Sequence, residues 1–195
     1  MARSVAVTFD YRCPFAYNGN LAAINAIRGG TDIEFRFVPF SLDQVHVSEG
    51  EPAMWERDPA DWGSGMRALL YGIAVRDTFG DAFFDAHIEL FAARHEHGKQ
   101  LGEEDVLKEA VAAAGLDADK VAEEAWSGRP LKTLQAEHTE CVDQHGVFGV
   151  PTFWEDGQAA FVRFMSRGDV DDLARMLEFL TWSELNEFKR PRIPR

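Results

Sequence analysis

The stretch TFDYRCPFAY, residues 8–17, joins a predicted strand to a predicted helix and carries one of the two cysteines of the chain. Before it, SVAVTFD (residues 4–10) has the alternating, β-branched pattern typical of a strand. After it, residues 14–28 are helical in composition and are followed by two glycines, which commonly end helices. Proline is well tolerated at the first helical position, so the sequence predicts that Cys13 is the N-cap residue of this helix.

An N-cap position would activate the sulfur of Cys13. The sulfur could accept hydrogen bonds from the free N–H groups of Phe15 and Ala16, and it would lie at the positive end of the helix dipole. Both effects favour the thiolate, so we predict a pKa below the ordinary value of about 8.5. The alternative interpretation is that Cys13 is only a small residue at a tight turn. Cys141 lies in the body of another predicted helix, and we do not expect it to resolve Cys13.

The pattern along the rest of the chain predicts an α/β protein. TDIEFRFVPFS (residues 31–41) predicts a second strand, and two strands joined by one helix form a parallel βαβ unit. From about Trp62 to His145 the pattern is helical throughout. VPTFWEDGQAAFVRF (residues 150–164) then predicts two short strands around an Asp-Gly turn, and residues 169–185 predict a closing helix with Asp169 as its N-cap.

This order of elements predicts a four-stranded mixed sheet with helices, interrupted by a helical insertion. We therefore expect a thioredoxin-like fold with an inserted helical domain. The expected thioredoxin-like domain comprises residues 1–45 and 130–195, and the expected all-helical domain comprises residues 46–129.

The second predicted element of the site is GVFGVPTF, residues 146–153. Pro151 lies at the start of a strand that should run beside the first one, which predicts a cis Val150–Pro151 peptide facing Cys13. The backbone of Val150 would then dock an extended thiol ligand. The alternative is an ordinary trans proline at a strand start.

FDYRCPFAY and GVFGVPTF, together with a helical insertion, resemble the DsbA-like thioredoxin superfamily. This group includes the 2-hydroxychromene-2-carboxylate isomerases and the kappa-class glutathione transferases. LFAARHEHGKQLGEEDVL, residues 90–107, is similar to the insertion of its cytosolic oxidoreductase members. The closest resemblance is to the actinobacterial branch, some of whose members are mycothiol-dependent reductases. Because the insertion of the family usually roofs the active site, the resemblance makes His95 a candidate substrate contact. The alternative is that His95 lies at a solvated helix end.

The sequence departs from the family at two positions. Redox members carry a resolving cysteine where this chain has Ala16, and isomerases and transferases usually carry serine where it has Cys13. A lone thiolate suits monothiol exchange, in which attack on a disulfide is followed by release with a second small thiol. We therefore predict a DsbA-like monothiol thiol-disulfide oxidoreductase, or a reductase that depends on a low-molecular-weight thiol, with Cys13 as its nucleophile.

The other predicted contacts of the thiol or substrate are Pro14, Phe15, Ala16, Val150, Pro151 and His95. We expect no tightly bound cofactor; mycothiol or glutathione would serve as cosubstrate, and the substrate would be a small-molecule or protein disulfide. Two alternatives remain open. One is a thiol-dependent isomerase or transferase, in which Cys13 only orients a bound thiol. The other is a non-catalytic thioredoxin-like binding module.

The amino-acid composition limits the classes of binding partner and the cellular compartment that we expect for this protein. The formal net charge is −13 and the isoelectric point is about 4.8, which disfavours binding to nucleic acid or anionic membranes. Two cysteines far apart in sequence do not form a disulfide framework, so we expect a cytoplasmic protein, with a homodimer left open. His138, Cys141 and His145 share one predicted helix face, but a fourth zinc ligand is not apparent, so we expect no metal. The basic stretch that closes the sequence, after Glu187, is expected to be a solvated tail.

Overall fold

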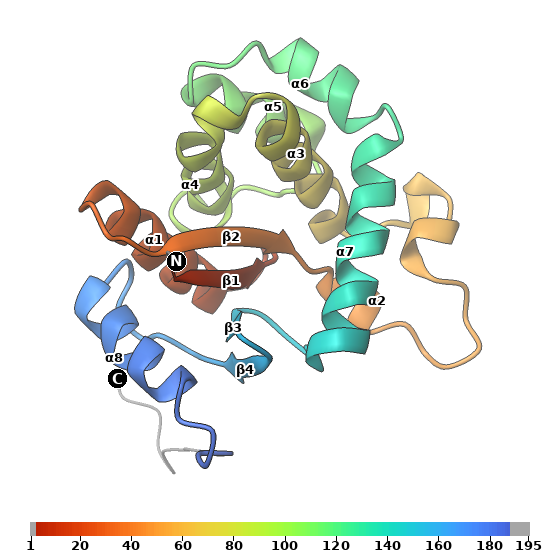
Figure 1. Cartoon of the computed structure of the whole chain (residues 1–195). Coiled ribbons are helices and arrows are strands. Elements are labelled where there is room, and N and C mark those ends of the chain that lie inside the picture. The colour runs from red at the N-terminus through yellow and green to blue at the C-terminus, as the bar shows by residue number, and fades with distance from the viewer. Residues whose placement is uncertain (1–2, 188–195) are drawn as a thin grey trace.

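The computed structural model describes residues 3–187 and has an α/β fold built on one mixed sheet (Figure 1). Within this range the strands are β1 (Ser4–Phe9), β2 (Glu34–Pro39), β3 (Thr152–Glu155) and β4 (Gln158–Phe161). The α-helices are α1 (Pro14–Arg28), α2 (Leu42–Val45), α3 (Ser64–Thr78), α4 (Phe83–His95), α5 (Glu104–Ala113), α6 (Ala118–Ala125), α7 (Arg129–His145) and α8 (Val170–Leu180). The basic tail predicted after Glu187 lies outside the described residues.

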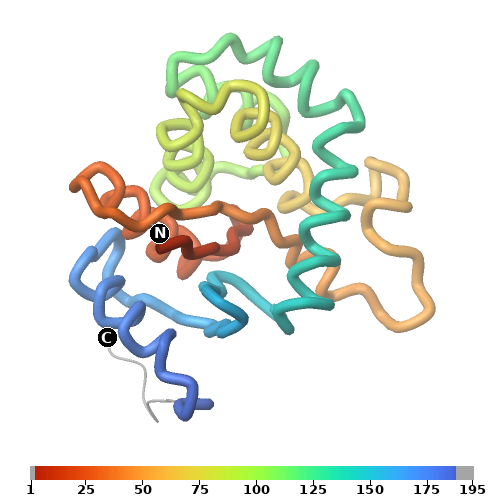
Figure 2. Tube along the Cα trace, in the orientation of Figure 1, coloured from red at the N-terminus to blue at the C-terminus, as the bar shows by residue number. Residues whose placement is uncertain are grey.

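The sheet has the strand order β2-β1-β3-β4. Strand β1 is parallel to β2 and antiparallel to β3, and β3 is antiparallel to β4. In this register Val7 pairs with Phe37 on one side and Phe153 on the other. The trace in Figure 2 shows how the first strand and the C-terminal hairpin come together although most of the chain separates them. The predicted thioredoxin-like sheet with a helical insertion is confirmed.

Local signals account for several of these boundaries. Helix α1 begins and ends at the residues that the sequence predicts. The β3–β4 turn places Asp156 at φ 48° and Gly157 at φ 80°, the left-handed conformations that such a hairpin turn requires. Asp169 is the N-cap of α8, and its carboxylate accepts from the N–H of Asp172 at 2.9 Å. Helix α8 ends earlier than predicted, at Leu180, because this is the last residue of its buried face and residues 181–184, which follow it, are exposed.

Helices α3 to α6 form the insertion, which Figure 1 shows above the sheet, with α8 on the opposite side. Helix α4 packs against α1, and its Phe83 and His87 rings each lie 5.6 Å from the ring of Phe37 in β2. Helix α7 runs from α6 down beside β2, so it contacts both the insertion and the sheet. The domain boundaries expected at 45/46 and 129/130 stay a prediction. No helix within residues 3–187 is long and apolar enough to cross a bilayer.

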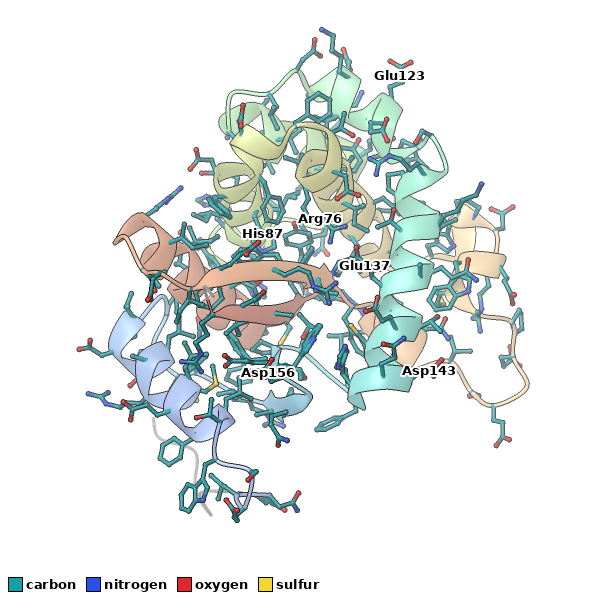
Figure 3. All side chains as sticks on the ribbon, in the orientation of Figure 1. Arg76, His87, Glu123, Glu137, Asp143 and Asp156 are labelled. Atoms are coloured by element: carbon teal, nitrogen blue, oxygen red, sulfur yellow. The ribbon has the colours of Figure 1, made fainter. Side chains whose placement is uncertain are left out.

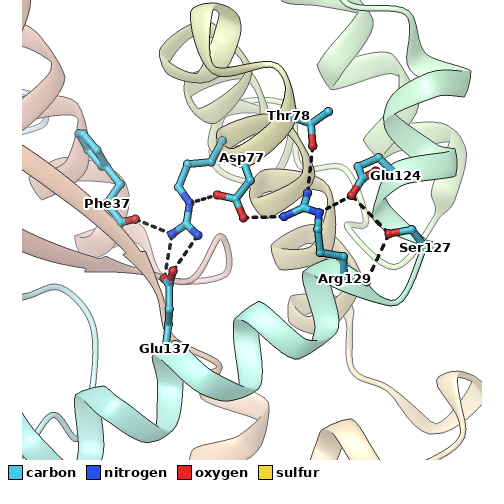
Figure 4. Close-up of polar contacts among 8 residues, drawn as sticks. Phe37, Asp77, Thr78, Glu124, Ser127, Arg129 and Glu137 are labelled. Atoms are coloured by element: carbon cyan, nitrogen blue, oxygen red, sulfur yellow. Dashed lines mark hydrogen bonds and ion pairs between the residues drawn. The ribbon is translucent and has the colours of Figure 1, made fainter.

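A polar network ties the insertion to the sheet (Figure 4). The guanidinium of Arg76 in α3 donates twice to the carboxylate of Glu137 in α7, at 2.8 Å each, and once to the backbone carbonyl of Phe37 at 2.9 Å. Asp77 accepts from Arg76 at 2.7 Å and from Arg129 at 2.8 Å. Helices α3 and α7 are therefore joined to each other and to β2 through one side chain.

Candidate functional site

Cys13 lies where the C-terminal end of β1 meets the start of α1. Its backbone is extended (φ −91°, ψ 116°) and Pro14 is the first helical residue, so the predicted N-cap position is confirmed. The N–H of Ala16 donates to the Cys13 sulfur at 3.4 Å. A turn closed by the hydrogen bond from the Cys13 N–H to the Asp10 carbonyl, at 3.0 Å, presents the side chain at the edge of the sheet.

The loop before β3 faces this sulfur. The Val150–Pro151 peptide is cis, and the Cys13 thiol donates to the carbonyl of Val150 at 3.3 Å. The hydroxyl of Thr8 in β1 accepts from the N–H of Thr152 at 2.8 Å, which holds the loop against the strand that leads to Cys13. The predicted cis peptide within reach of Cys13 is therefore confirmed. Its role in docking a thiol ligand stays a prediction.

The predicted fall in the pKa of Cys13 is wrong. Burial of the sulfur raises the pKa above its ordinary value, and this effect outweighs the N–H groups of Ala16 and Phe15 and the charge of Arg163, which lower it. The buried carboxylate of Asp10 raises it further. The sequence predicts the N-cap position of Cys13 but not how deeply the folded chain buries its sulfur. In this state the sulfur is a protonated donor to Val150 rather than a thiolate.

A buried network positions the turn that carries Cys13 (Figure 3 labels His87 in α4). The hydroxyl of Tyr11 lies 2.8 Å from Nδ1 of His87, and Nε2 of His87 lies 3.2 Å from the side-chain oxygen of Asn20. The Asn20 amide in turn donates to the carbonyls of Thr8 and Ala16, at 3.1 and 2.8 Å. Burial lowers the pKa of His87 to about 3, so the ring is neutral. Neither Tyr11 nor His87 was predicted; a histidine set among the phenylalanine, isoleucine and leucine residues of FFDAHIELF is the signal that could have found the network.

Asp10 fixes the same turn from its other side. This fully buried carboxylate accepts from the N–H groups of Arg12 and Leu42, each at 2.9 Å, and so ties the end of β1 to the start of α2. The guanidinium of Arg12 forms an ion pair with Asp43 at 2.7 Å. The role of Asp10 was not predicted, although an acidic residue directly after a buried strand is a signal in the sequence.

His95 contacts the backbone of this segment rather than the sulfur. Its Nε2 lies 2.9 Å from the carbonyl of Tyr11, which can only accept, so Nε2 carries the proton. The ring is half-buried beside Tyr17, with 6.0 Å between ring centroids, and burial lowers its pKa. Glu96, the next residue, accepts from the hydroxyl of Tyr17 and from Arg167 at 2.8 Å each. The insertion therefore reaches the site as expected, while contact of His95 with a substrate stays a prediction.

Comparison with known proteins agrees with this geometry. The family described as DSBA-like thioredoxin domain matches residues 4–178, which is most of the chain and includes both Cys13 and Pro151. The chain belongs to this family.

Several solved structures share the fold of this DSBA-like protein at low sequence identity. A variant of DsbA from Pseudomonas aeruginosa superimposes with a TM-score of 0.62 at 20% identity, covering 93% of this chain and 86% of its own. Oxidised BdbD of Bacillus subtilis also gives 0.62, at 15% identity and 92% and 87% coverage. DsbA of Xylella fastidiosa gives 0.59, at 21% identity and 93% and 85% coverage.

A relative by sequence is the Mycobacterium tuberculosis protein Rv2286c, which is described as uncharacterized. It is 28% identical over 155 residues, covering 78% of this DSBA-like chain. The matched region spans 64% of the length of that relative. The comparison therefore relates the two chains as distant homologues and assigns no activity to this chain.

The DSBA-like site contains one cysteine. Ala16, where the resemblance places the resolving cysteine of redox members, is fully buried, and Cys13 and Cys141 are both free. Cys141 is buried within α7, where burial raises the pKa of its thiol to about 12. The remaining predicted contacts differ in exposure: Pro14 is exposed, and Phe15 is half-buried beside Arg163.

The residues weighed as metal ligands have separate partners. Nδ1 of His138 accepts from the N–H of Ser41 at 3.1 Å, and the ring of His145 stacks on Trp154 with 4.8 Å between centroids. Among residues 3–187 no group of three histidine, cysteine or acidic side chains is arranged to hold a metal ion.

Proposed function

We propose that this DSBA-like protein is a monothiol thiol-disulfide oxidoreductase, or a reductase dependent on a low-molecular-weight thiol, in which Cys13 is the nucleophile. The observation that carries the proposal is the position of its sulfur. It lies at the N-cap of α1, 3.4 Å from the Ala16 nitrogen and 3.3 Å from the Val150 carbonyl of the cis-proline loop. A sulfur so placed is reachable by an extended disulfide that lies along that loop.

The chemistry begins with loss of the thiol proton. The Val150 carbonyl holds that proton in the resting state, and once it leaves, the N–H groups of Phe15 and Ala16 stabilise the thiolate. The thiolate attacks one sulfur of the disulfide, a new Cys13 S–S bond forms as the old one breaks, and the leaving thiolate takes a proton from water. A second small thiol, as thiolate, then attacks the mixed disulfide, which returns Cys13 and yields a new small disulfide.

Two features support a cycle without an internal disulfide. Ala16 cannot resolve the adduct, and Cys141 is buried with a thiol whose pKa is about 12. A small thiol in solution must therefore release Cys13 from the mixed disulfide, and we propose that this thiol is mycothiol or glutathione. Similarity to a mycobacterial protein supports keeping mycothiol in this pair, in line with the resemblance to mycothiol-dependent reductases. The same proposal places the protein in the cytoplasm, where small thiols are kept reduced.

The raised pKa of Cys13 favours one alternative. A protonated thiol that donates a hydrogen bond can orient a bound thiol cofactor without attacking it, as a serine does in the isomerases and transferases that the sequence resembles. The second candidate function is therefore a thiol-dependent isomerase or transferase at the same site.

The intact mass of the protein after incubation with oxidised glutathione tests the proposal. We expect one glutathione adduct on the native chain, one on Cys141→Ser and none on Cys13→Ser, and we expect reduced glutathione to remove the adduct. The buried Cys141 provides the matched control because it is the other free thiol. If the native chain forms no adduct while binding glutathione without reaction, the isomerase or transferase becomes the leading function. If glutathione neither forms an adduct nor binds, the non-catalytic binding module becomes the leading interpretation.

A further inference from the structure

We propose that Arg163 binds a carboxylate on the non-reacting half of the disulfide, so that the site selects anionic small disulfides. This inference rests on the proposed function, because it names the substrate class of the same site. It is carried by the position of Arg163, by the two rings that hold it and by the absence of an acidic partner for it among residues 3–187.

Arg163 follows the end of β4 and lies beside the cis-proline loop. Phe161, two residues before it, pairs with Thr152 across the β3–β4 ladder. The N–H of Val162 donates to the carbonyl of Pro151 at 3.0 Å. The chain therefore delivers Arg163 beside the loop whose Val150 carbonyl contacts the Cys13 sulfur.

Two aromatic rings hold the guanidinium. Its central carbon lies 5.7 Å from the ring centroid of Phe15 and 5.4 Å from that of Phe161, both within the range of cation–π attraction. Phe15 is two residues after Cys13, and the Phe161 ring lies 5.2 Å from that of Phe148, which is 68% exposed. The guanidinium thus occupies a row of aromatic side chains between the start of α1 and the cis-proline loop.

Arg163 is charged, exposed and available to a ligand. In the part of the chain that the structure describes, its guanidinium lies over these two rings and makes no ion pair and no hydrogen bond. Arg167, four residues later, differs: it stacks on Tyr17 and is already paired with Glu96 at 2.8 Å. Since the protein carries a net charge of −13, a free guanidinium beside the nucleophile is an attractive site for an anion on a surface that otherwise repels anions.

The chemistry of the occupant follows from this row. A disulfide with one sulfur at Cys13 would lie across Phe15 and Phe161, and a carboxylate on its far half would meet the N–H donors of Arg163. Glutathione disulfide has such carboxylates and mycothiol disulfide lacks them. The attack itself is the exchange written above, so no further oxidant or reductant is needed.

Three symmetric disulfides of similar size test the selectivity: dithiodipropionate is anionic, hydroxyethyl disulfide is neutral and cystamine is cationic. The rate of adduct formation on Cys13 is measured by intact mass for each probe. Arg163→Met should lower the rate with dithiodipropionate about fivefold relative to the neutral probe and should raise the relative rate with cystamine. The ratio between probes cancels any common effect of the variant on the Cys13 thiol. Arg163→Lys should keep most of the selectivity.

Arg28→Met is the matched control. It removes one positive charge at the far end of α1, about 20 Å along the helix from Cys13. It should leave the ratios between probes unchanged. Equal ratios in native protein and Arg163→Met would overturn the inference while the proposed function stands.

Binding of dithiodipropionate to Cys13→Ser, followed by NMR titration, separates the remaining outcomes. If Cys13→Ser binds dithiodipropionate and the double variant Cys13→Ser, Arg163→Met does not, the anion site is supported. If in addition the native chain forms no adduct, only the proposed exchange function is overturned. Absence of both binding and adducts overturns both.

Discussion

The sulfur of Cys13 is subject to opposing influences on its charge. Burial raises its pKa most strongly, the N–H groups of Ala16 and Phe15 lower it, the carboxylate of Asp10 raises it, and the guanidinium of Arg163 lowers it. The resting thiol also donates to the Val150 carbonyl, an interaction that a thiolate cannot make. A ligand that displaces this contact would therefore change the balance toward the thiolate, because it removes the acceptor that favours the protonated form.

This balance gives a prediction for the native chain. The rate of iodoacetamide labelling of Cys13, resolved by peptide mass, should rise with a midpoint above about pH 8.5, the ordinary value for a thiol. Cys141 should label more slowly at every pH, because it is 1% exposed and its pKa is raised to about 12. Protein unfolded in urea is the control, in which both cysteines should titrate near about 8.5. A midpoint below about pH 7 for Cys13 would contradict the dominance of burial.

At the scale of elements, the parts that were predictable are those that local patterns encode. Helix α1 was predicted from its helical pattern with Pro14 and the two glycines at its ends, the hairpin from its Asp-Gly turn, and the start of α8 from Asp169. Each of these signals depends on residues only a few positions apart. The cis proline opposite Cys13 followed from the strand order. The contacts of His87 with Tyr11 and Asn20 were not predicted, because they join residues 76 and 67 positions apart that only the docking of α4 brings together. The direction of the Cys13 pKa shift failed for the same reason.

The attachment of the insertion to the sheet can be tested through Arg76 (Figure 4). Its side chain is 17% exposed and makes a bidentate ion pair with Glu137, so Arg76→Met leaves a half-buried carboxylate and the Phe37 carbonyl without their donor. We expect a loss of about 2 kcal/mol in the free energy of unfolding, between the values for exposed and fully buried pairs. Arg129→Met is the control within the same network: its side chain is 42% exposed, and its loss should cost about 0.5–1 kcal/mol. Urea unfolding measures both, and equal costs would contradict a special role for Arg76.

For the whole molecule, the buried histidines connect the insertion, the sheet and the turn that carries Cys13. His87 contacts Phe9 of β1 and Phe37 of β2 as well as Tyr11. Burial lowers the pKa of His87 to about 3 and that of His138 to about 4. Both rings are therefore neutral in the folded protein across the pH range in which an exposed histidine, with a pKa of about 6.5, takes up a proton.

These values predict how stability depends on pH. Since the folded pKa of His87 lies below its unfolded value, the unfolded chain binds more protons as the pH falls, and stability present above about pH 6.5 is lost toward pH 3. The loss approaches about 1.4 kcal/mol per pH unit for each such histidine. His87→Gln is the informative variant, because its amide can accept from Tyr11 and donate to Asn20 without titrating. It should be less stable than the native chain at about pH 7, and urea unfolding should show the difference shrinking by about 2–3 kcal/mol between about pH 6.5 and pH 4. A difference that stays constant across this range would show that His87 is not held neutral.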